Sequence, residues 1–233
     1  MSCLVVLALS VLVPVITFVA YLDTGGDTGG SSPPDRVDPA PDPGDIFQDD
    51  FESVSKKNWD TDKEENFAIK YSDDALKLST EPSSSVAELK GEDAGKPLDV
   101  DDVSVEADIT QVSDNTDGEA SWGLVCRAED YDNYYVALLW SNGDVIISKV
   151  KNDNFADPLD NADGSEAFDG STATNHIRFD CVGKTLTMYL NDQEVAKAKD
   201  STFATGTIGL SVNSDDTSSK VEASFDNLLV SSP

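Results

Sequence analysis

From residue 46 onward, apolar and polar side chains alternate one by one along many short stretches. Residues 103–111, VSVEADITQ, have valine, alanine or isoleucine at nearly every second position and mostly polar residues between them. The same alternation continues in residues 177–181, 186–190, 208–212 and 221–225. Neighbouring side chains leave opposite faces of a pleated strand, so this period of two predicts strands with one buried face.

A longer pair of strands is predicted in the middle of the chain. Residues 134–140, YYVALLW, are apolar on both faces, as in a central strand that is covered on each side. The Asn142–Gly143 pair favours a tight hairpin turn, and residues 145–150, VIISKV, form the returning strand. Many short strands between turn signals, without a 12-residue helical stripe, predict an all-β antiparallel β-sandwich over residues 46–233.

An uncharged apolar segment, residues 4–22, precedes the alternating region. Its length is close to the roughly 20 residues that an α-helix needs to cross a bilayer, so we expect residues 1–22 to form a transmembrane anchor. A cleaved signal peptide and a secreted protein are the alternative. A cut after Ala20 would place Phe18 where a small residue belongs, which favours the uncleaved anchor.

Residues 23–45 are dominated by Gly, Ser, Pro and Asp and contain no apolar repeat. Such a segment buries too little surface to offset its chain entropy, which predicts a disordered linker. The bulk of the chain follows the apolar segment, and we expect it outside the cell. The linker would then hold the sandwich clear of the membrane.

The 233 residues carry a formal net charge of -29, from 45 acidic and 16 basic side chains. A field of this sign repels phosphate backbones, so nucleic acid is not an expected partner. The roughly 190 residues of the sandwich can bury most of their unfolded surface, so stability requires no cofactor.

Several motifs occur in an order that resembles known domains. They are GLVCR, DNYYVALL and GDVIISKV, then NHIRFDCVGKTLTMYLND, GTIGLSV and FDNLLV, with FQDDFES before them. Together they resemble the concanavalin A-like, laminin-G-like jelly rolls, and most closely the 3-keto-disaccharide hydrolase domain family of bacterial surface proteins. The resemblance covers residues 46–230 and implies a jelly-roll fold. Lectins, adhesion modules and glycoside hydrolases share that fold, so it does not fix a function.

Two cysteines, Cys126 and Cys181, each lie on the apolar face of a predicted strand. Outside the cell, oxidising conditions favour a disulfide between them. It would close a loop of about 55 residues, worth roughly 4 kcal/mol in unfolding free energy. Two buried thiols are the alternative.

No catalytic residue is predicted. Residues 106–111, EADITQ, resemble the Glu-x-Asp-x-x-Glu strand of glycoside hydrolase family 16, whose retaining chemistry needs two carboxyl groups about 5 to 5.5 Å apart. Gln111 stands in place of the second acid, and an amide cannot transfer the proton. Glu106 and Asp108 then form the solvent side of the strand, and His176, the one histidine, is expected at the surface.

Arg127, Tyr135 and Trp140 are the candidate carbohydrate-binding residues, because two adjacent strands carry them. Sugar sites combine aromatic faces with a few polar groups. For the two aromatic side chains, burial in the core is the alternative.

Asp50 and Asp226 are the candidate metal ligands. Their motifs, DDF and FDN, resemble the paired terminal strands of the family, and their carboxylates could share a structural calcium ion. Hydrogen bonds to loop backbone are the alternative.

The sequence thus predicts a membrane-tethered extracellular module that binds glycans or mediates adhesion without catalysis. A hydrolase of modified (3-keto) glycosides, which the resemblance implies, is the first alternative. A purely structural surface domain is the second.

Overall fold

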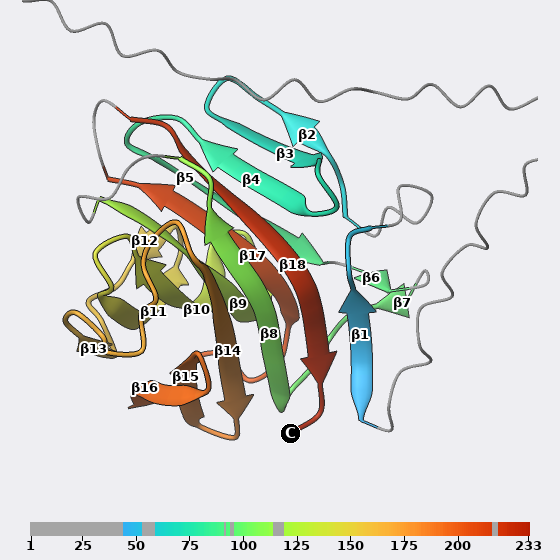
Figure 1. Cartoon of the computed structure of the whole chain (residues 1–233). Helices are drawn as coiled ribbons and strands as arrows, with labels where there is room; N and C mark the ends of the chain where they lie inside the picture. Colours follow the sequence, from blue (N-terminus) through green and yellow to red (C-terminus); the bar gives the residue numbers. More distant parts are fainter. Residues whose placement is uncertain (1–43, 53–58, 91, 94–95, 114–118, 216–218) are drawn as a thin grey trace, which may run out of the picture. The chain divides into compact units, whose positions relative to one another are not determined.

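Two antiparallel sheets lie face to face and enclose most of the apolar side chains (Figure 1). The computed structural model describes residues 44–52, 59–90, 92–93, 96–113, 119–215 and 219–233. No helix occurs in these ranges, and so none of them offers a helix long and apolar enough to span a membrane. The anchor predicted at residues 1–22 and nearly all of the linker predicted at 23–45 lie outside the described residues.

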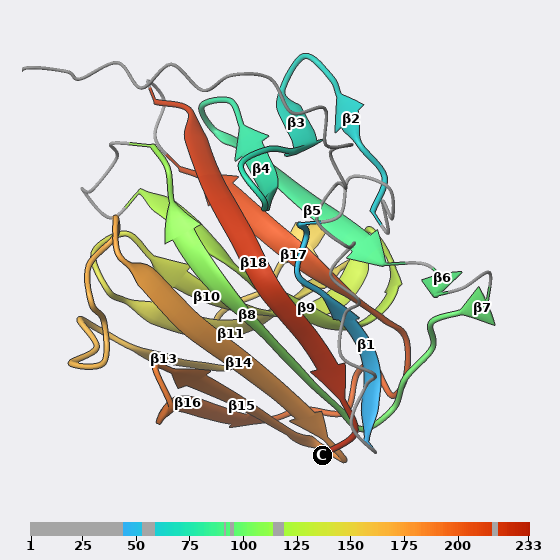
Figure 2. The same cartoon turned by 45° about the vertical axis from the view of Figure 1, so that its right-hand side comes forward.

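One layer, called sheet A, has β8 and β18 side by side at its centre (Figure 2). Its strands follow one another in space as β16 (Gln193–Lys199), β15 (Thr185–Leu190), β14 (Thr174–Val182), β8 (Val103–Gln111), β18 (Val221–Ser231), β4 (Leu76–Thr80), β3 (Phe67–Tyr71) and β2 (Asp62–Lys63). The first described strand, β1 (Asp45–Asp49), also pairs with β18, so the two ends of the sandwich are held together.

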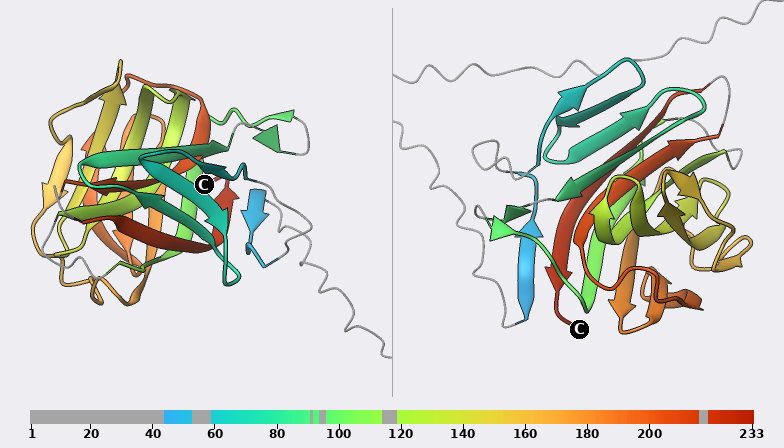
Figure 3. Two further views of the ribbon diagram at one scale, coloured as in Figure 1. Left: turned by 90° about the horizontal axis from the view of Figure 1, so that it is seen from above. Right: turned by 180° about the vertical axis from the view of Figure 1, so that it is seen from behind.

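The other layer, called sheet B, has β9, β10 and β17 at its centre. Its order is β12 (Asn154–Phe155), β11 (Val145–Lys151), β10 (Asn133–Trp140), β9 (Ala120–Asp130), β17 (Thr207–Ser214) and β5 (Ser84–Lys90), with β13 (Asp160–Ala162) paired to β11. A small hairpin consists of β6 (Glu92–Asp93) and β7 (Lys96–Pro97). Figure 3 gives the two layers from above and from behind.

The alternating apolar residues form the core between the sheets, as the period of two predicts. Trp122 and Leu124 of β9, and Phe179 of β14, are fully buried there. The polar partners in the same strands, such as Glu106 and Asp108 of β8, are partly exposed on the outside. The all-β antiparallel sandwich predicted from the alternation is therefore confirmed.

The hairpin predicted at Asn142–Gly143 joins β10 to β11. Gly143 has a φ of 90°, a conformation that residues with a side chain rarely adopt. The side-chain oxygen of Asn142 accepts a hydrogen bond from the backbone N–H of Asp144 at 3.0 Å and closes the turn. This turn fixes the register of β10 against β11.

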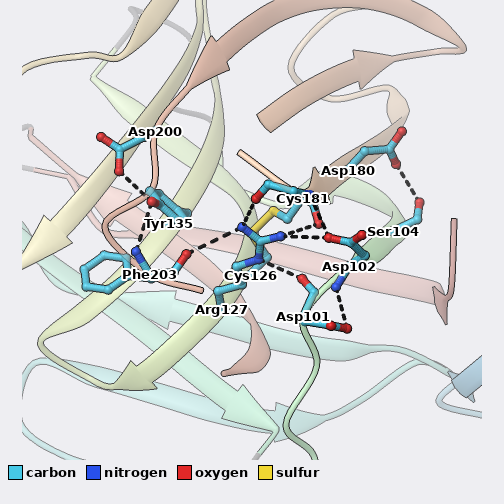
Figure 4. Close-up of a disulfide and its surroundings, with 11 residues drawn as sticks. Asp101, Asp102, Ser104, Cys126, Arg127, Tyr135, Asp180, Cys181, Asp200 and Phe203 are labelled. Atoms are coloured by element: carbon cyan, nitrogen blue, oxygen red, sulfur yellow. Dashed lines mark hydrogen bonds and ion pairs between the residues drawn. A yellow bond between two sulfur atoms is a disulfide. The ribbon is translucent and has the colours of Figure 1, made fainter. Parts of the chain in front are cut away.

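A disulfide joins Cys126 of β9 to Cys181 of β14, with Cα atoms 6.8 Å apart (Figure 4). The predicted pairing is confirmed, and it links sheet B to sheet A across the core. Because the two cysteines are 55 positions apart, the bond restricts a long loop of the unfolded chain.

Candidate functional site: a groove on the outer face of sheet B

Three neighbouring depressions lie on the outer face of sheet B, and we call them together the sheet B groove. The central depression has a volume of about 440 Å³, and the other two have about 250 and 100 Å³. Trp140 lines the central and the 250 Å³ depression, and Phe155 lines the central and the 100 Å³ depression. The described residues that line the central depression are Ser83, Ser84, Ser85, Ser121, Leu138, Trp140, Phe155, Asn213, Ser214 and Asp215.

Strand register places the main lining residues in one row across sheet B. Asn213 of β17 pairs with Ser85 of β5 on one side and with Ser121 of β9 on the other. Ser121 in turn pairs with Trp140 of β10. Residues paired directly across an antiparallel ladder project from the same face. The row therefore runs from three small polar side chains to one large aromatic ring.

A glycine lies in the next row, where β9 and β10 approach closely. Gly123 of β9 lies between Ser211 of β17 and Leu138 of β10. A Cβ atom at Gly123 would lie 1.8 Å from the carbonyl oxygen of Ala137, so the backbones are too close for any side chain. Glycine at this position therefore permits the close packing of the two strands next to the groove.

One side of the groove is apolar and comes mainly from β10. Leu138 and Trp140 lie there, and Phe155 of β12 stands at the rim with 53% of its surface exposed. Leu138 also belongs to a second apolar cluster, separate from the main core, with Val125, Ala128 and Val136, against which Tyr134 packs. The aromatic side chains of Trp140 and Phe155 can contact the apolar face of a ligand.

The other side of the groove offers uncharged hydrogen-bonding groups. Asn213 donates a hydrogen bond from Nδ2 to Oγ of Ser121 at 3.2 Å, which leaves its amide oxygen facing the same side of the sheet. Across the groove, the indole Nε1 of Trp140 is buried and has no hydrogen-bond partner among the described residues.

The 100 Å³ depression extends the groove to Tyr134 of β10. Burial, and then the charges of Asp153 and Asp132, raise the pKa of Tyr134 to about 12. Its hydroxyl therefore stays protonated at neutral pH and is able to donate a hydrogen bond.

Arg127, a predicted contact residue, points into the sandwich instead (Figure 4). Its φ of 49° lies in the left-handed region, and the register of β9 with both neighbours shifts at this point. Such a bulge turns the side chain away from the face that Val125 occupies. Arg127 is 1% exposed, and its guanidinium donates to Asp101 O, Gly183 O, Cys181 O and the carboxylate of Asp102. We therefore correct the expectation: this arginine stabilises the fold and lies away from the groove.

Tyr135, the second predicted contact residue, lies in the core. Its hydroxyl donates a hydrogen bond to Asp200 at 2.6 Å and accepts one from the backbone of Thr202 at 2.8 Å. Asp200 also pairs with Lys149 at 2.6 Å. Burial disfavours the charge of Asp200, but the hydrogen bonds from Lys149, Thr202 and Tyr135 outweigh it and lower its pKa. Of the three predicted contact residues, Trp140 alone lines the groove.

The two predicted metal ligands, Asp50 and Asp226, use their carboxylates on nearby backbone. Asp50 accepts a hydrogen bond from the N–H of Glu52 at 3.1 Å, and Asp226 accepts one from Asn227 at 2.7 Å. Burial, and then like charges that include Asp108, raise the pKa of Asp226. Within the described ranges no group of three or more acids, cysteines or histidines is placed to hold a metal. The hydrogen bonds expected as the alternative are present, and calcium stays a prediction.

A charged cluster lies on the opposite side of the molecule, on the outer face of sheet A. His176 of β14 sits between two carboxylates of β8, with Nδ1 2.8 Å from Asp108 and Nε2 3.5 Å from Glu106. The hydrogen bond to Glu106 and a second to Asp108 raise the pKa of His176 to about 9, although burial opposes this. Asn227 donates to the other oxygen of Asp108 at 2.9 Å. These groups satisfy one another.

Sequence reasoning missed most of the groove. The small polar positions of β17, Ser211 and Asn213, alternate with apolar residues in GLSVNS, and the sequence analysis assigned them no role. The apolar outer positions of β10 were expected to be covered, whereas Leu138 and Trp140 line a depression. An apolar outer face next to small polar residues is the signal that could have identified the groove.

Comparisons with known proteins identify solved structures that share this fold. No family model matches the chain, and no curated protein matches it. Among solved structures, it is similar to the carbohydrate binding module CBM66 from Bacillus subtilis, with a TM-score of 0.54 and 23% identity over 66% of this chain and 86% of that one. It is also similar to a prokaryotic β-1,3-1,4-glucanase (lichenase) derived from a mouse hindgut metagenome, with a TM-score of 0.57 and 14% identity over 80% and 99% of the two chains.

A third similar structure is the Emp47p carbohydrate recognition domain, with a TM-score of 0.54 and 14% identity over 79% of this chain and 94% of that chain. These structures are galectin-like and concanavalin A-like jelly rolls, and this chain has the same type of fold. At such identities the likeness concerns the fold alone. The narrower resemblance to the 3-keto-disaccharide hydrolase family stays a prediction.

Proposed function

We propose that the domain is a non-catalytic glycan-binding module and that the sheet B groove is its binding site. The observation that carries this proposal is the composition of the groove. Aromatic side chains, Trp140 and Phe155, face small uncharged hydrogen-bonding groups such as Ser85 and Asn213 across an open depression. Sugars present apolar ring faces and polar edges, and sites for them combine these same two kinds of group. The carbohydrate-binding neighbours of the same fold support the proposal.

The position of the carboxylates favours binding over hydrolysis. Glycoside hydrolysis needs two carboxyl groups on either side of the bond to be cleaved. Asp215 is the one acid among the described residues that line the central depression, and the other lining acids, Asp144, Asp163 and Asp153, lie in the two flanking depressions. Glu106 and Asp108 lie on the outer face of the other sheet and are bonded to His176. A hydrolase of modified glycosides is the alternative, and the glucanase neighbour of the same fold is the observation in its favour.

The location of the module, anchored to a membrane and outside the cell, is part of the proposal. The apolar residues 4–22 would anchor it in a membrane, and residues 23–45 would separate the sandwich from that membrane. The disulfide between Cys126 and Cys181 fits an oxidising environment outside the cell.

A glycan array with the full-length protein tests the proposal. The protein is kept in a zwitterionic detergent without a sugar head group, which could otherwise compete. We expect retention of defined glycans without turnover, and loss of retention in Trp140→Ala. Tyr189→Ala is the matched control, because Tyr189 is a partly exposed aromatic residue that stacks under Arg178 on sheet A. Turnover of a glycan would favour the hydrolase, and absence of both binding and turnover would favour a structural domain.

A further inference from the structure

The sheet B groove is lined by acids and lacks bases, and this composition restricts what it can bind. The described residues that line the three depressions include Asp215 in the central one, Asp144 and Asp163 in the 250 Å³ one, and Asp153 in the 100 Å³ one. No lysine, arginine or histidine is among these described lining residues. The acids lie in all three depressions, so a ligand that covers the groove meets negative charge along its whole length.

Two of the cations close to the groove in sequence are occupied inside the sandwich, and a third, the exposed Lys151 of β11, is not among the described lining residues. Arg127 is buried and bonded to backbone carbonyls, and Lys149 of β11 pairs with Asp200 at 2.6 Å. Recognition of a carboxylate or sulfate group usually depends on an arginine or lysine that can form a charge-assisted hydrogen bond. The described groove offers no such group.

The charge of the whole chain acts in the same direction. Its formal net charge of -29 creates a field that repels anions approaching any face, and a partly enclosed groove focuses that field. Like-charge contacts at an interface are a strong means of excluding wrong partners. The groups that remain to bind a ligand are hydroxyls, the amides of Asn161 and Asn213, and apolar surface.

We propose that the groove selects uncharged glycans and rejects acidic ones, meaning chains that carry uronate, carboxymethyl or sulfate groups. This inference rests on the proposed glycan-binding function. The aromatic residues shared between depressions, Trp140 and Phe155, stack against unmodified rings, and Asp153 and Asp215 repel an anionic substituent on the same chain.

The experiment compares the same glycan with and without charge. Glucan, galactan and fructan oligosaccharides, each unmodified and carboxymethylated, are titrated by calorimetry into the full-length protein in 0.1 M and 1 M salt. At 0.1 M salt we expect the carboxymethylated form of the bound glycan to bind at least tenfold more weakly than the unmodified form. At 1 M salt, where charges are screened beyond about 3 Å, the difference should fall to threefold or less.

A charge-neutralised variant assigns the effect to the groove. Asp153→Asn with Asp215→Asn removes two of its acids, and asparagine tolerates the positive φ of residue 153. The matched control is Asp74→Asn with Asp192→Asn, which makes the same charge change at two exposed turns, both of them at positive φ, away from the groove. We expect the groove variant to bind the carboxymethylated form at least threefold better than the control does, with unchanged binding of the unmodified form.

The outcomes separate the two proposals. Equal or tighter binding of the acidic form at 0.1 M salt would overturn the charge selection and leave glycan binding intact. Equal effects of the groove variant and its control would also overturn it, because the discrimination would then come from the net charge alone. If none of the glycans binds at either salt concentration, the proposed function fails and the inference fails with it.

Discussion

The two outer faces of the sandwich are built from the same alternation of residues, yet they differ in whether their outward side chains form charged pairs across strands. On sheet A the outward residues of β8 and β14 are cross-strand partners: Asp108 faces His176, Glu106 faces Arg178, and Ser104 donates to Asp180 at 2.7 Å. On sheet B the outward row from Ser85 to Trp140 contains no charged pair.

This difference indicates which face can contribute most to the binding of a ligand. Charges that are paired across strands contribute to the sheet and have little to offer a partner. The groove of sheet B instead has exposed aromatic surface at Phe155 next to small uncharged side chains such as Ser85 and Asn213. Exposed apolar area rimmed by polar groups is typical of a binding surface. Changes on sheet A should therefore affect stability, and changes in the groove should affect binding.

Removing the disulfide should have the largest effect, because it links the sheets that carry the two faces. Replacing both Cys126 and Cys181 by alanine should lower the free energy of unfolding by roughly 4 kcal/mol, from the entropy that the unfolded chain regains. Denaturant titration of the variant against the oxidised protein measures this. A loss below about 1 kcal/mol would mean that the bond adds little to the link between the sheets.

Replacing Arg127 by methionine should have the second-largest effect on the free energy of unfolding. The variant keeps much of the side-chain volume but leaves several buried carbonyl oxygens without the donor they now have. We expect the free energy of unfolding to fall by about 3 kcal/mol. Glycan affinity well below the unfolding transition should stay within twofold. A variant of unchanged stability with lost binding would show that Arg127 serves the groove after all.

Trp140→Ala should separate the two faces most clearly. Losing the ring should weaken glycan binding about thirtyfold, equivalent to about 2 kcal/mol, since buried aromatic anchors dominate binding energy. Stability should change little, because the ring lies at the surface of sheet B. Calorimetric titration and thermal unfolding on the same sample measure both. Equal losses for Trp140→Ala and the Tyr189→Ala control would remove the distinction between the faces.

His176→Gln should have the smallest effect, and it should depend on pH. The folded protein raises the pKa of His176 to about 9 from its ordinary 6.5, so its charge contributes stability in full below pH 6.5 and loses it as pH rises through 9. Discounted for solvent screening at this partly exposed site, the contribution is about 1 kcal/mol. The stability difference between the parent protein and the variant should shrink from pH 6 to pH 10.

A second titrating group makes the comparison with a variant necessary. Burial, and then the charges of Asp60 and Asp62, raise the pKa of Glu88 to about 7, so this residue also makes stability fall as pH rises, over the window from 4.5 to 7. Both proteins share that contribution, and it cancels in the difference. A difference that stays constant up to pH 10 would contradict the role of the His176 cluster.

The fold was largely predictable from sequence, and the site was not. Alternation identifies strands because it reports which side chains are buried, and two cysteines on buried faces were enough to indicate the disulfide. The bulge at Arg127 could not be predicted, because it depends on a register shift between β9, β10 and β17 and not on the residue itself. One irregular residue turned an expected surface arginine into a buried one.

The groove depends on pairings that connect distant parts of the chain. Ser85, Ser121, Trp140 and Asn213 share one row because β5, β9, β10 and β17 are neighbours, and sequence alternation alone does not give the order of strands in a sheet. Trp140 could be proposed because it is an aromatic residue on one of two adjacent strands, and sugar sites use aromatic faces. Its small polar neighbours had no signal of their own.

The indole N–H signals of the three tryptophans offer the most direct test of the central claim, that glycans bind in the sheet B groove. Trp59 and Trp122 are buried in the core, whereas Trp140 lines the groove. In a nitrogen–proton correlation spectrum, a neutral glycan retained on the array should shift the Trp140 signal and leave the other two in place. A glycan that binds by calorimetry while the Trp140 signal stays unmoved would contradict the account.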